Sequence, residues 1–496
     1  MGNNNNLDEK LKKAKNYLKN GYLTEAETIY EDILEIYPSS KVALKGLKKL
    51  RTKQKEKQMR NNDADFSMEE QNQLAALYNQ GDALVTLNEV SRLAKVYPTH
   101  PYIYNMMGIC FKDLNDNKNA INCYVKALEF KNNYSEVYYN LANLLKAEGR
   151  DDEALMTVTE GLKQDSSNVN LYFMLSTLKQ IEVKSKELKE IKKLEELSDN
   201  YQDKIQLNSI LFEIYEKADK KKKAFKYLET ANTLSKEATK YDVEHHKIYF
   251  SLIKDIFEEN VLPLDEDLRD ENEKEMIFIV GMPQSGNKTV SKILETNDNV
   301  LNIGISNLLN SIVDSFLMER TEDTKLDQDI IKAIYDIYRD NIAKFNSDKP
   351  IYLDVTSNNF IFLGFIMAIF PNAKIIHTFR DPYQNCCALY KNNFLSAGFN
   401  YTSDMNDIVE FYKLYSDIIS FWKEKYPNNI YDISYDKLLN DEKDETIKLF
   451  EFCNLETTSN SFDITKDRSN IYNDKIRKFE NYFKPIKKKL SKANLL

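Results

Sequence analysis

The strongest chemical signal in this sequence of 496 residues is a glycine-rich loop between an apolar run and an amphipathic run. Residues 277–280 predict a buried strand, and the apolar side chains of residues 290–294 recur at helical spacing. Gly281 and Gly286 bracket the turn between them. Such a loop directs backbone N–H groups and the positive end of the helix dipole at one point, where an anion is favoured. The alternative is an ordinary strand-to-helix turn, but small residues and Lys288 in the turn favour phosphate.

Two segments supply the candidate anion-binding residues. They are Ser285, Gly286, Asn287, Lys288 and Thr289 of the loop and first helical turn, together with Arg380. Arg380 follows the predicted strand 374–378 in an Arg-Asp-Pro segment. Ligands of parallel sheets bind at the carboxyl ends of the strands, so Arg380 can reach the same anion as the loop. An arginine at a strand end can instead pair with a carboxylate. Because the glycine loop and Arg380 both suit an anion and both lie at strand ends, we favour a shared phosphate site.

The elements that position these residues form an α/β domain. From Glu275 onward, short apolar runs alternate with amphipathic helices, which predicts a parallel sheet covered by helices. The predicted strands are residues 277–280, 351–353, 374–378 and 430–433.

The first half of the chain has a helical repeat. Tyr104, Tyr138 and Tyr172 are spaced by 34 residues, and the same period relates Ala120 to Ala154. Each repeat is predicted to be a helical hairpin, and stacked hairpins form a superhelix whose concave face holds peptides or proteins. Either the array binds such a partner there, or it only supports the second domain. We predict a first unit at 1–50, a charged linker at 51–66, an array with a degenerate unit and a junction helix at 67–270, and the α/β domain at 271–496.

Composition narrows the class of protein. An apolar content of 42% and an aromatic content of 11% are ordinary for a folded protein, and the net charge of −9 gives no global attraction to nucleic acid. The five cysteines lack metal-ligand spacing and indicate a reducing compartment. No segment has the length of a membrane span, and residues 1–10 are polar where a secretory signal is apolar. We therefore expect a cytoplasmic protein.

Several motifs resemble, in one order, those of the sulfotransferases that carry N-terminal tetratricopeptide repeats (TPR). They are Val280-Gly281-Met282-Pro283 with Ser285-Gly286, Phe370-Pro371-Asn372-Ala373, Ile375-Ile376-His377, Arg380-Asp381-Pro382, Tyr390 with Asn393-Phe394, Ser434-Tyr435-Asp436 and Phe450-Glu451-Phe452-Cys453. The resemblance implies an all-α TPR superhelix followed by a P-loop-like α/β sulfotransferase domain. It also implies sulfuryl transfer from 3′-phosphoadenosine 5′-phosphosulfate (PAPS) to a hydroxyl or amine acceptor, without a metal. The loop would hold the 5′-phosphosulfate, and Arg380 would hold the 3′-phosphate.

The sequence departs from the family at four polar positions. The loop has Gln284 where the family has arginine, Ile305 where it has a glutamate base, Val355 where it has lysine and Ala388 where it has serine. In one hypothesis Lys288 supplies the missing catalytic charge. In another, the domain has lost its chemistry and the protein is a TPR interaction scaffold.

A third hypothesis and two weaker signals remain. The glycine spacing also approaches that of a nucleoside-triphosphate loop, in which Asp354 would hold Mg²⁺. His377 lies within an apolar strand and is interpreted as a satisfied core group. By the resemblance, Arg468, Lys475 and Arg477 are possible phosphate contacts.

Overall fold

The computed structural model describes residues 2–20, 23–36, 40–51, 66–79, 83–259, 261–320, 325–392, 398–462 and 476–496. Its internal contacts divide the chain into two compact units, residues 1–187 and 188–496. Most of the predicted linker at 51–66 lies outside the described residues. The unit boundary falls inside the region predicted to be repeats, so the last repeat-like helices share a unit with the sheet.

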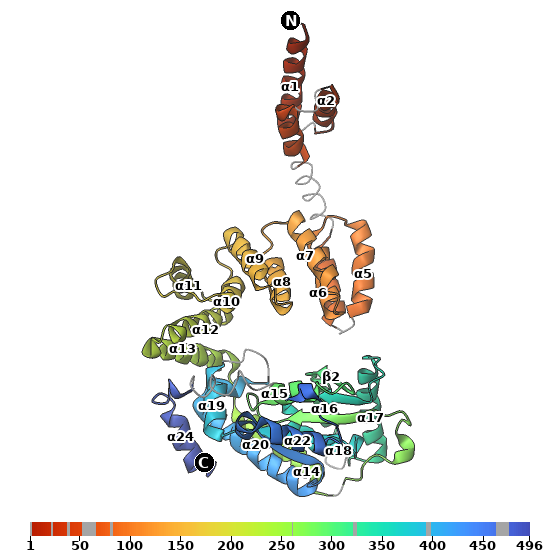
Figure 1. The fold of residues 1–496 in the computed structure, drawn as a ribbon, viewed down its shortest axis with the longest axis vertical. Coiled ribbons are helices and arrows are strands. Elements are labelled where there is room, and N and C mark those ends of the chain that lie inside the picture. Colours follow the sequence, from red (N-terminus) through yellow and green to blue (C-terminus); the bar gives the residue numbers. More distant parts are fainter. Residues whose placement is uncertain are drawn as a thin grey trace. The chain divides into compact units, whose positions relative to one another are not determined.

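The first unit is a series of helices (Figure 1). They are α1 (Gly2–Asn20), α2 (Leu23–Ile36), α4 (Met68–Asn79), α5 (Ala83–Val96), α6 (Pro101–Asp113), α7 (Asn117–Phe130), α8 (Ser135–Ala147), α9 (Asp151–Gln164) and α10 (Val169–Leu178), and residues 41–51 are also helical. Helices α6 and α7 pack as one hairpin, and α8 and α9 pack as the next.

The hairpins follow from the repeated residue types. The three tyrosines spaced by 34 residues are buried, at 6%, 7% and 4% exposure for Tyr104, Tyr138 and Tyr172. The turns inside the hairpins place Asn115 and Gly149 at φ of 60° and 75°, a region open to glycine and tolerated by asparagine. The prediction of helical hairpins with a Gly or Asn turn is confirmed at these two hairpins.

The second unit starts within α11 (Lys186–Leu197) and continues through α12 (Tyr201–Lys217), α13 (Lys221–Thr239) and α14 (Val243–Glu258). Helices α12 and α13 form another hairpin and pack against the α/β part of the unit. The Asn232 amide donates to the Tyr390 carbonyl at 2.9 Å, and the Phe225 ring stacks on Tyr482 with centroids 4.5 Å apart. Lys391 and Glu216 form an ion pair with side chains only 10% and 14% exposed.

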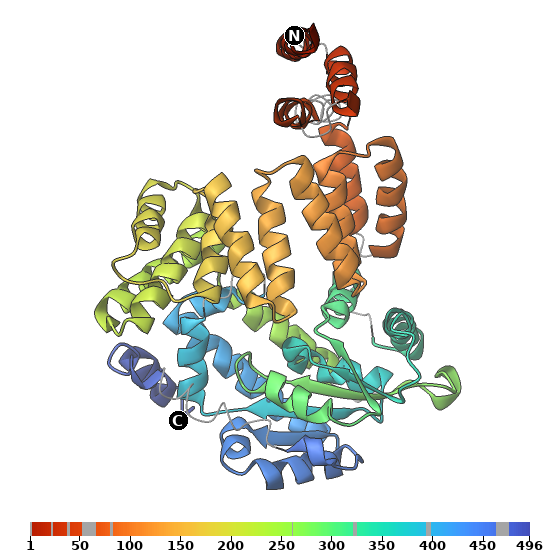
Figure 2. The same ribbon diagram turned by 45° about the horizontal axis from the view of Figure 1, so that its top comes forward.

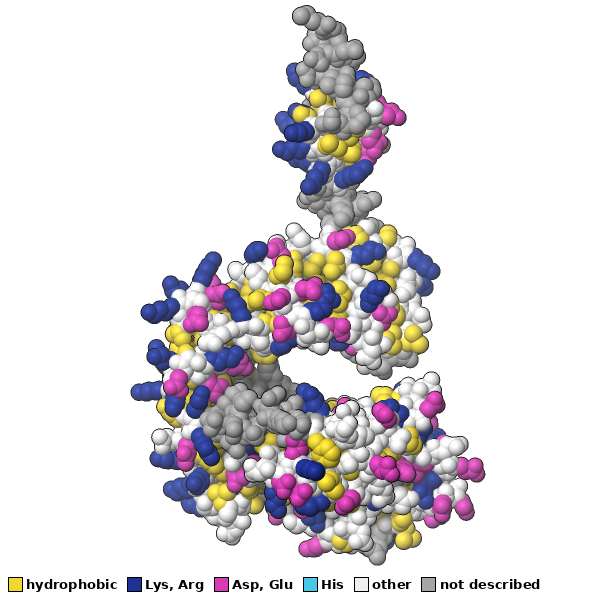
Figure 3. Space-filling view, in the orientation of Figure 1, with side chains coloured by type: hydrophobic (Ala, Val, Ile, Leu, Met, Phe, Trp, Pro, Cys, Tyr) yellow, Lys and Arg dark blue, Asp and Glu magenta, His cyan; other side chains and the backbone are white. Residues whose placement is uncertain are grey.

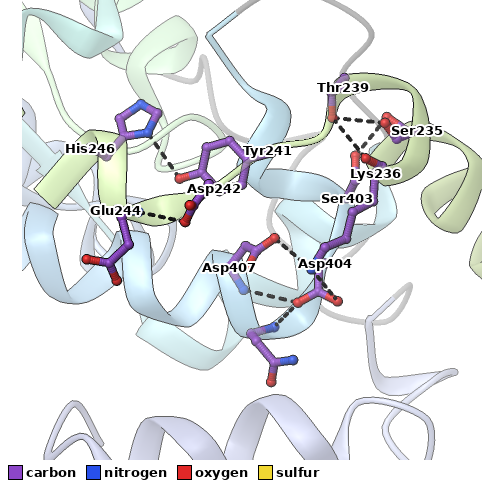
Figure 4. A network of polar contacts seen from close by, with 11 residues as sticks. Ser235, Lys236, Thr239, Tyr241, Asp242, Glu244, His246, Ser403, Asp404 and Asp407 are labelled. Carbon is purple, nitrogen blue, oxygen red and sulfur yellow. Dashed lines mark hydrogen bonds and ion pairs between the residues drawn. The ribbon is translucent and has the colours of Figure 1, made fainter.

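A polar network joins the end of α13 to the start of α20 (Met405–Lys425) (Figure 4). The Lys236 ammonium lies 3.0 Å from Asp407 and 3.3 Å from Asp404. The hydroxyls of Ser235 and Ser403 are 2.8 Å apart and buried. The α12–α13 hairpin is therefore an integral part of the second unit.

The sheet of the second unit has five parallel strands in the order β2-β3-β1-β4-β5. They are β1 (Glu275–Val280), β2 (Val300–Gly304), β3 (Ile351–Asp354), β4 (Lys374–Phe379) and β5 (Ile430–Ser434). Four of them match the predicted runs. Strand β2 was not predicted, because Asn302 interrupts its apolar run and its register with β3 is irregular.

Helices cover both faces of this sheet, and Figure 2 shows α21 (Tyr435–Asn440) and α22 (Glu442–Phe452) along one side of it. On that face Ile277 and Ile279 of β1 pack in one cluster with residues of α15 (Asn287–Leu294) and α22. On the other face Phe278 contacts Tyr338 of α17 (Gln328–Ala343). The alternation of side chains along β1 thus supports three layers.

The remaining elements of the unit are η1 (Glu266–Leu268), α16 (Leu308–Glu319), η2 (Ser357–Phe362), α18 (Leu363–Ile369), α19 (Pro382–Lys391), η3 (Asn400–Ser403), η4 (Ser459–Ser461) and α24 (Lys484–Lys492). No helix among the described residues is both long and apolar enough to cross a bilayer. On the face shown in Figure 3, Lys and Arg side chains are interspersed with Asp and Glu. This face therefore shows no broad positive patch, and an anion site on it would need individual Lys or Arg residues.

Candidate functional site

Two glycines let the loop between β1 and α15 pack closely against its surroundings. Gly281 has φ of 141°, and a Cβ placed on it would lie 2.2 Å from the carbonyl oxygen of Thr378. Gly286 has φ of 108°, and a Cβ there would lie 2.4 Å from the Tyr435 ring. Any larger residue at either position would displace the loop, so both glycines are required by its shape.

A set of buried hydrogen bonds holds the loop to β4 and to the segment after β3. The hydroxyls of Ser285 and Thr378 lie 2.7 Å and 2.6 Å from the Asn287 side-chain oxygen and 2.8 Å from each other, so their two protons form two of these three hydrogen bonds. The Asn287 amide donates to the Ser357 hydroxyl at 2.9 Å, and the Gly281 N–H donates to the Ser357 carbonyl. The side chains of Ser285 and Asn287, which were predicted as phosphate ligands, thus also hold the shape of the loop.

The groups that remain for an anion lie at the start of α15. The N–H groups of Asn287 and Lys288 belong to the first turn, where an α-helix supplies no acceptor of its own. The Lys288 side chain is exposed, whereas Thr289 is buried at 3% exposure. Two backbone donors, the positive helix end and one exposed ammonium group are groups that favour a bound anion.

Arg380 lies beside this loop because β4 pairs directly with β1. Its side chain is 3% exposed, donates to the Gln384 side-chain oxygen at 2.6 Å, and lies over the Tyr435 ring at 5.6 Å. The next residue, Asp381, caps α19 by accepting from the Gln384 N–H at 2.8 Å, and its own N–H donates to Asp436. The guanidinium is therefore held in a fixed place near the carboxyl edge of the sheet.

The substituted positions have apolar side chains in very different surroundings. Ile305, at the carboxyl end of β2, is 77% exposed, while Ala388 is fully buried in α19 and Val355 packs against the core. None of these three side chains can accept a proton or neutralise an anion. The glycine loop and Arg380 are therefore present, whereas the glutamate, lysine and serine that the resemblance implies at these three positions are not.

Asp354 is buried and already bonded to three donors, which is a poor setting for a magnesium ion. It is 1% exposed and accepts hydrogen bonds from the Tyr338 hydroxyl at 2.7 Å, the Thr356 N–H at 2.8 Å and the Asn359 amide at 3.3 Å. Burial raises the pKa of this carboxyl, although the three hydrogen bonds act in the opposite direction. This geometry counts against the hypothesis of a magnesium-dependent nucleoside-triphosphate site. Within the described residues, no group of His, Cys, Asp and Glu side chains is arranged to hold a metal ion.

The structure describes His377 and Arg477, but not all of the other residues singled out in the sequence. His377 is 3% exposed with two hydrogen-bond partners, so its interpretation as a satisfied core group is confirmed. Arg477 is exposed, whereas Arg468 and Lys475 lie outside the described residues, as do Asn393 and Phe394.

Burial raises the pKa of both Cys386 and Cys387, which makes poor nucleophiles of them. A cavity of about 450 Å³ opens at the amino ends of the strands, away from this site.

The fold defines an α/β domain with a glycine-rich loop after its first strand, preceded by helical hairpins. The sequence model of the sulfotransferase family matches residues 276–459, and the model of the TPR repeat matches residues 110–149. The chain thus carries a sulfotransferase-family domain and TPR repeats, as the sequence motifs predicted.

Known proteins add limited detail. An uncharacterized protein of Aquifex aeolicus (strain VF5) is 27% identical over 305 residues, which cover 56% of this chain and 40% of that protein. The chain therefore spans less than half the length of this relative. A MamA fragment from Desulfovibrio magneticus RS-1 (18% identity, 34% of this chain, 93% of that chain, TM-score 0.28) is one similar solved structure. Another is TTC0263, a TPR protein of Thermus thermophilus (20% identity, 35% and 98% covered, TM-score 0.21). The assignment of the repeats rests on the family model and the 34-residue period.

Proposed function

We propose that the protein is a cytoplasmic PAPS-dependent sulfotransferase with an altered donor site, which transfers a sulfuryl group to a hydroxyl or amine acceptor. The observation that carries the proposal is the adjacency of β1 and β4, since it brings the glycine loop and Arg380 to one edge of the sheet. The glycine loop suits the 5′-phosphosulfate, and Arg380 suits the 3′-phosphate.

The residues at this edge fit the donor. The N–H groups of Asn287 and Lys288 and the Lys288 ammonium would hold the 5′-phosphosulfate, with the hydroxyl of Thr289 close to them in the first turn. Arg380 would hold the 3′-phosphate through its planar guanidinium, which suits two phosphate oxygens. Charge neutralisation by fixed donors is the main contribution of such a site to group transfer. A protein or peptide held on the concave face of the TPR array is the acceptor class that the two-part chain suggests.

The test is isothermal titration of the full chain with adenosine 3′,5′-bisphosphate. We expect micromolar binding that weakens by roughly 10- to 100-fold in Arg380→Ala, because a hydrogen-bonded charge contributes about 1.5–3 kcal/mol. Lys288→Ala is expected to weaken binding by about tenfold. Lys292→Ala is the matched control, because Lys292 is also exposed on α15 but lies one turn further from the loop. Equal affinities in Arg380→Ala and the wild type would remove Arg380 from the site.

A second candidate function is that of a catalytically inactive sulfotransferase fold that serves as a TPR scaffold. The exposed Ile305 at the carboxyl edge of β2 favours it, because the position is open to solvent and lacks a base. Nucleotide binding without transfer of ³⁵S from labelled PAPS to any hydroxyl or amine in an acceptor panel would support this alternative. Transfer to one acceptor, abolished in Arg380→Ala, would exclude it.

A further inference from the structure

A buried asparagine of α19 holds one carbonyl of the glycine loop. The side-chain amide of Asn385 donates to the Pro283 carbonyl at 2.9 Å, and Asn385 is only 1% exposed. Only the nitrogen of an amide can donate to a carbonyl, so this contact fixes the orientation of the Asn385 side chain. Its oxygen has no hydrogen-bond partner among the described residues. Burying an amide with an unpaired oxygen is unfavourable, so what asparagine contributes at this position is the hydrogen bond to Pro283.

Pro283 and Gln284 form the middle of a tight turn. The Ser285 N–H donates to the Met282 carbonyl at 3.2 Å, which closes the turn. Proline restricts its own φ to about −65°. Gln284 has φ of 66°. A hydrogen-bonded turn with proline at its second residue and positive φ at its third is a type II turn, which usually has glycine or asparagine at the third residue.

A type I turn would relieve the strained backbone of Gln284. Types I and II differ mainly in the orientation of the central peptide, which here joins Pro283 to Gln284. Type I gives the third residue a φ of about −90°, which suits glutamine, but it turns the central carbonyl toward the opposite face of the turn. Asn385 can therefore bond to the Pro283 carbonyl only in the observed orientation. This hydrogen bond favours type II against the preference of glutamine.

The same part of α19 also holds Arg380. The Arg380 guanidinium donates to the Gln384 side-chain oxygen at 2.6 Å, and the Gln384 N–H donates to Asp381 at 2.8 Å. Asn385 directly follows Gln384 in the helix. Two adjacent residues of one helix therefore contact the arginine and the glycine loop.

We propose that Asn385 is a positioning residue, which selects the type II form of the turn at residues 282–285 and so fixes the glycine loop relative to Arg380. Ser285 closes this turn, and the chain then passes through Gly286 into the first turn of α15. A change of turn type would alter the path by which the chain enters α15. The effect on donor binding rests on the proposed function, whereas the effect on the turn does not.

The first experiment observes the turn without nucleotide. Residues 283–284 are the only Pro-Gln pair in the sequence, so labelling with ¹³C-proline and ¹⁵N-glutamine in a deuterated background selects one amide signal through the Pro-Gln peptide bond. The Hα of the second residue lies close to the N–H of the third in a type II turn and further from it in type I, because ψ of the second residue differs. We expect a strong cross-peak between the Pro283 Hα and the Gln284 N–H in the wild type. Its absence would overturn the proposal.

Variants of two buried asparagines test the role of Asn385. Asn385→Leu removes the hydrogen-bond donor at similar side-chain size, and we expect the cross-peak to weaken about twofold or more as type I becomes populated. Asn232→Leu is the matched control, because Asn232 is also 1% exposed, also donates to a backbone carbonyl at 2.9 Å and also has an oxygen without a partner among the described residues. An unchanged cross-peak in Asn385→Leu, or equal losses in the two variants, would overturn the proposal. If Asn385→Leu does not fold, Asn385→Ser replaces it, because the shorter serine side chain cannot reach Pro283.

A glycine at position 284 tests whether backbone strain is the reason for this role. Glycine adopts positive φ freely, so the type II turn should no longer depend on Asn385 in the Gln284→Gly background. The cross-peak is then followed with ¹⁵N-glycine, since the unchanged sequence has no Pro-Gly pair. We expect Asn385→Leu to leave it unchanged in that background. A loss as large as in the original background would show that Asn385 acts by general packing, which contradicts the proposal.

The second experiment separates this inference from the proposed function. If the wild type binds adenosine 3′,5′-bisphosphate, Asn385→Leu is expected to weaken binding about tenfold, and Asn232→Leu is expected to leave it unchanged. If the wild type does not bind, the proposed function fails, but the cross-peaks still decide whether Asn385 sets the turn. Unchanged affinity in Asn385→Leu together with a weaker cross-peak would limit the role of Asn385 to the turn and refute its part in donor binding.

Discussion

Replacement of Gly281 by alanine is the most direct test of the loop geometry. The added methyl group would lie 2.2 Å from the Thr378 carbonyl oxygen and 3.0 Å from its hydroxyl. The nearer atom belongs to the backbone of β4, so no side-chain rotation can relieve the contact. Alanine would also have to adopt φ of 141°, a region that side chains disfavour.

The expected destabilisation has two parts. Backbone strain at such a position costs about 1–3 kcal/mol, and overpacking of a tight contact adds about 1–3 kcal/mol. The unfolding entropy of a unit of about 300 residues is roughly 0.6 kcal/mol/K, so each kcal/mol lowers the midpoint by about 1.6 °C. Gly281→Ala should therefore lower the thermal midpoint of the second unit by about 3–10 °C.

Gly304→Ala is the control that isolates the contact. Gly304 has φ of 86° in the same unit, but a Cβ there has no atom within 4 Å, so only backbone strain applies. We expect a decrease of about 2–5 °C, measured by calorimetry at a fixed scan rate. If the two variants lose the same stability, β4 and the loop can separate freely, and the close approach at Gly281 does not determine the shape of the loop.

Two further predictions concern buried charge. Lys391→Met should destabilise the second unit by about 3–5 kcal/mol in urea unfolding, because it leaves Glu216 at 14% exposure without its partner, and adding Glu216→Leu should restore most of this. Burial lowers the pKa of His377, although the hydrogen bond to Asp432 acts in the opposite direction. Below about pH 6.5 the unfolded state therefore binds more protons than the folded state. Stability should therefore fall on acidification from pH 7.5 to 5.5, and His377→Phe should reduce this slope; an unchanged slope would contradict the lowered pKa.

The part of the site that was predictable from sequence is the part encoded by local residue types. Glycines around a turn after an apolar run, and an Arg-Asp-Pro segment after another run, located the loop and Arg380. The anchors Thr378, Ser357 and Tyr435 were not predicted, because their roles depend on contacts across strands that have no local sequence pattern. Two signals were available: each lies at or just beyond the end of a strand, and Tyr435 stands in the Ser434-Tyr435-Asp436 motif.

The domain organisation also depends on contacts between distant segments, which local sequence patterns do not show. The 34-residue period located the hairpins, since small and aromatic residues must alternate wherever helices stack. Periodicity does not show which neighbour a hairpin packs against. The α12–α13 hairpin has the residue pattern of a repeat, yet Asn232 and Phe225 contact Tyr390 and Tyr482 of the second unit. Strand β2 was missed for a related reason, since one polar residue in a five-residue strand removes the apolar signal.

The strain in the loop bears on whether the loop is an ordinary connection between a strand and a helix. Gln284 adopts φ of 66°, an unfavourable region for a residue with a side chain, and such strain costs about 1–3 kcal/mol. It persists only because surrounding contacts fix the chain, here the hydrogen bonds that Thr378 makes with Ser285 and Asn287. An ordinary strand-to-helix connection needs neither this strain nor a buried polar cluster. The combination fixes the backbone at the start of α15, which is the part of the loop where the proposed function places the anion.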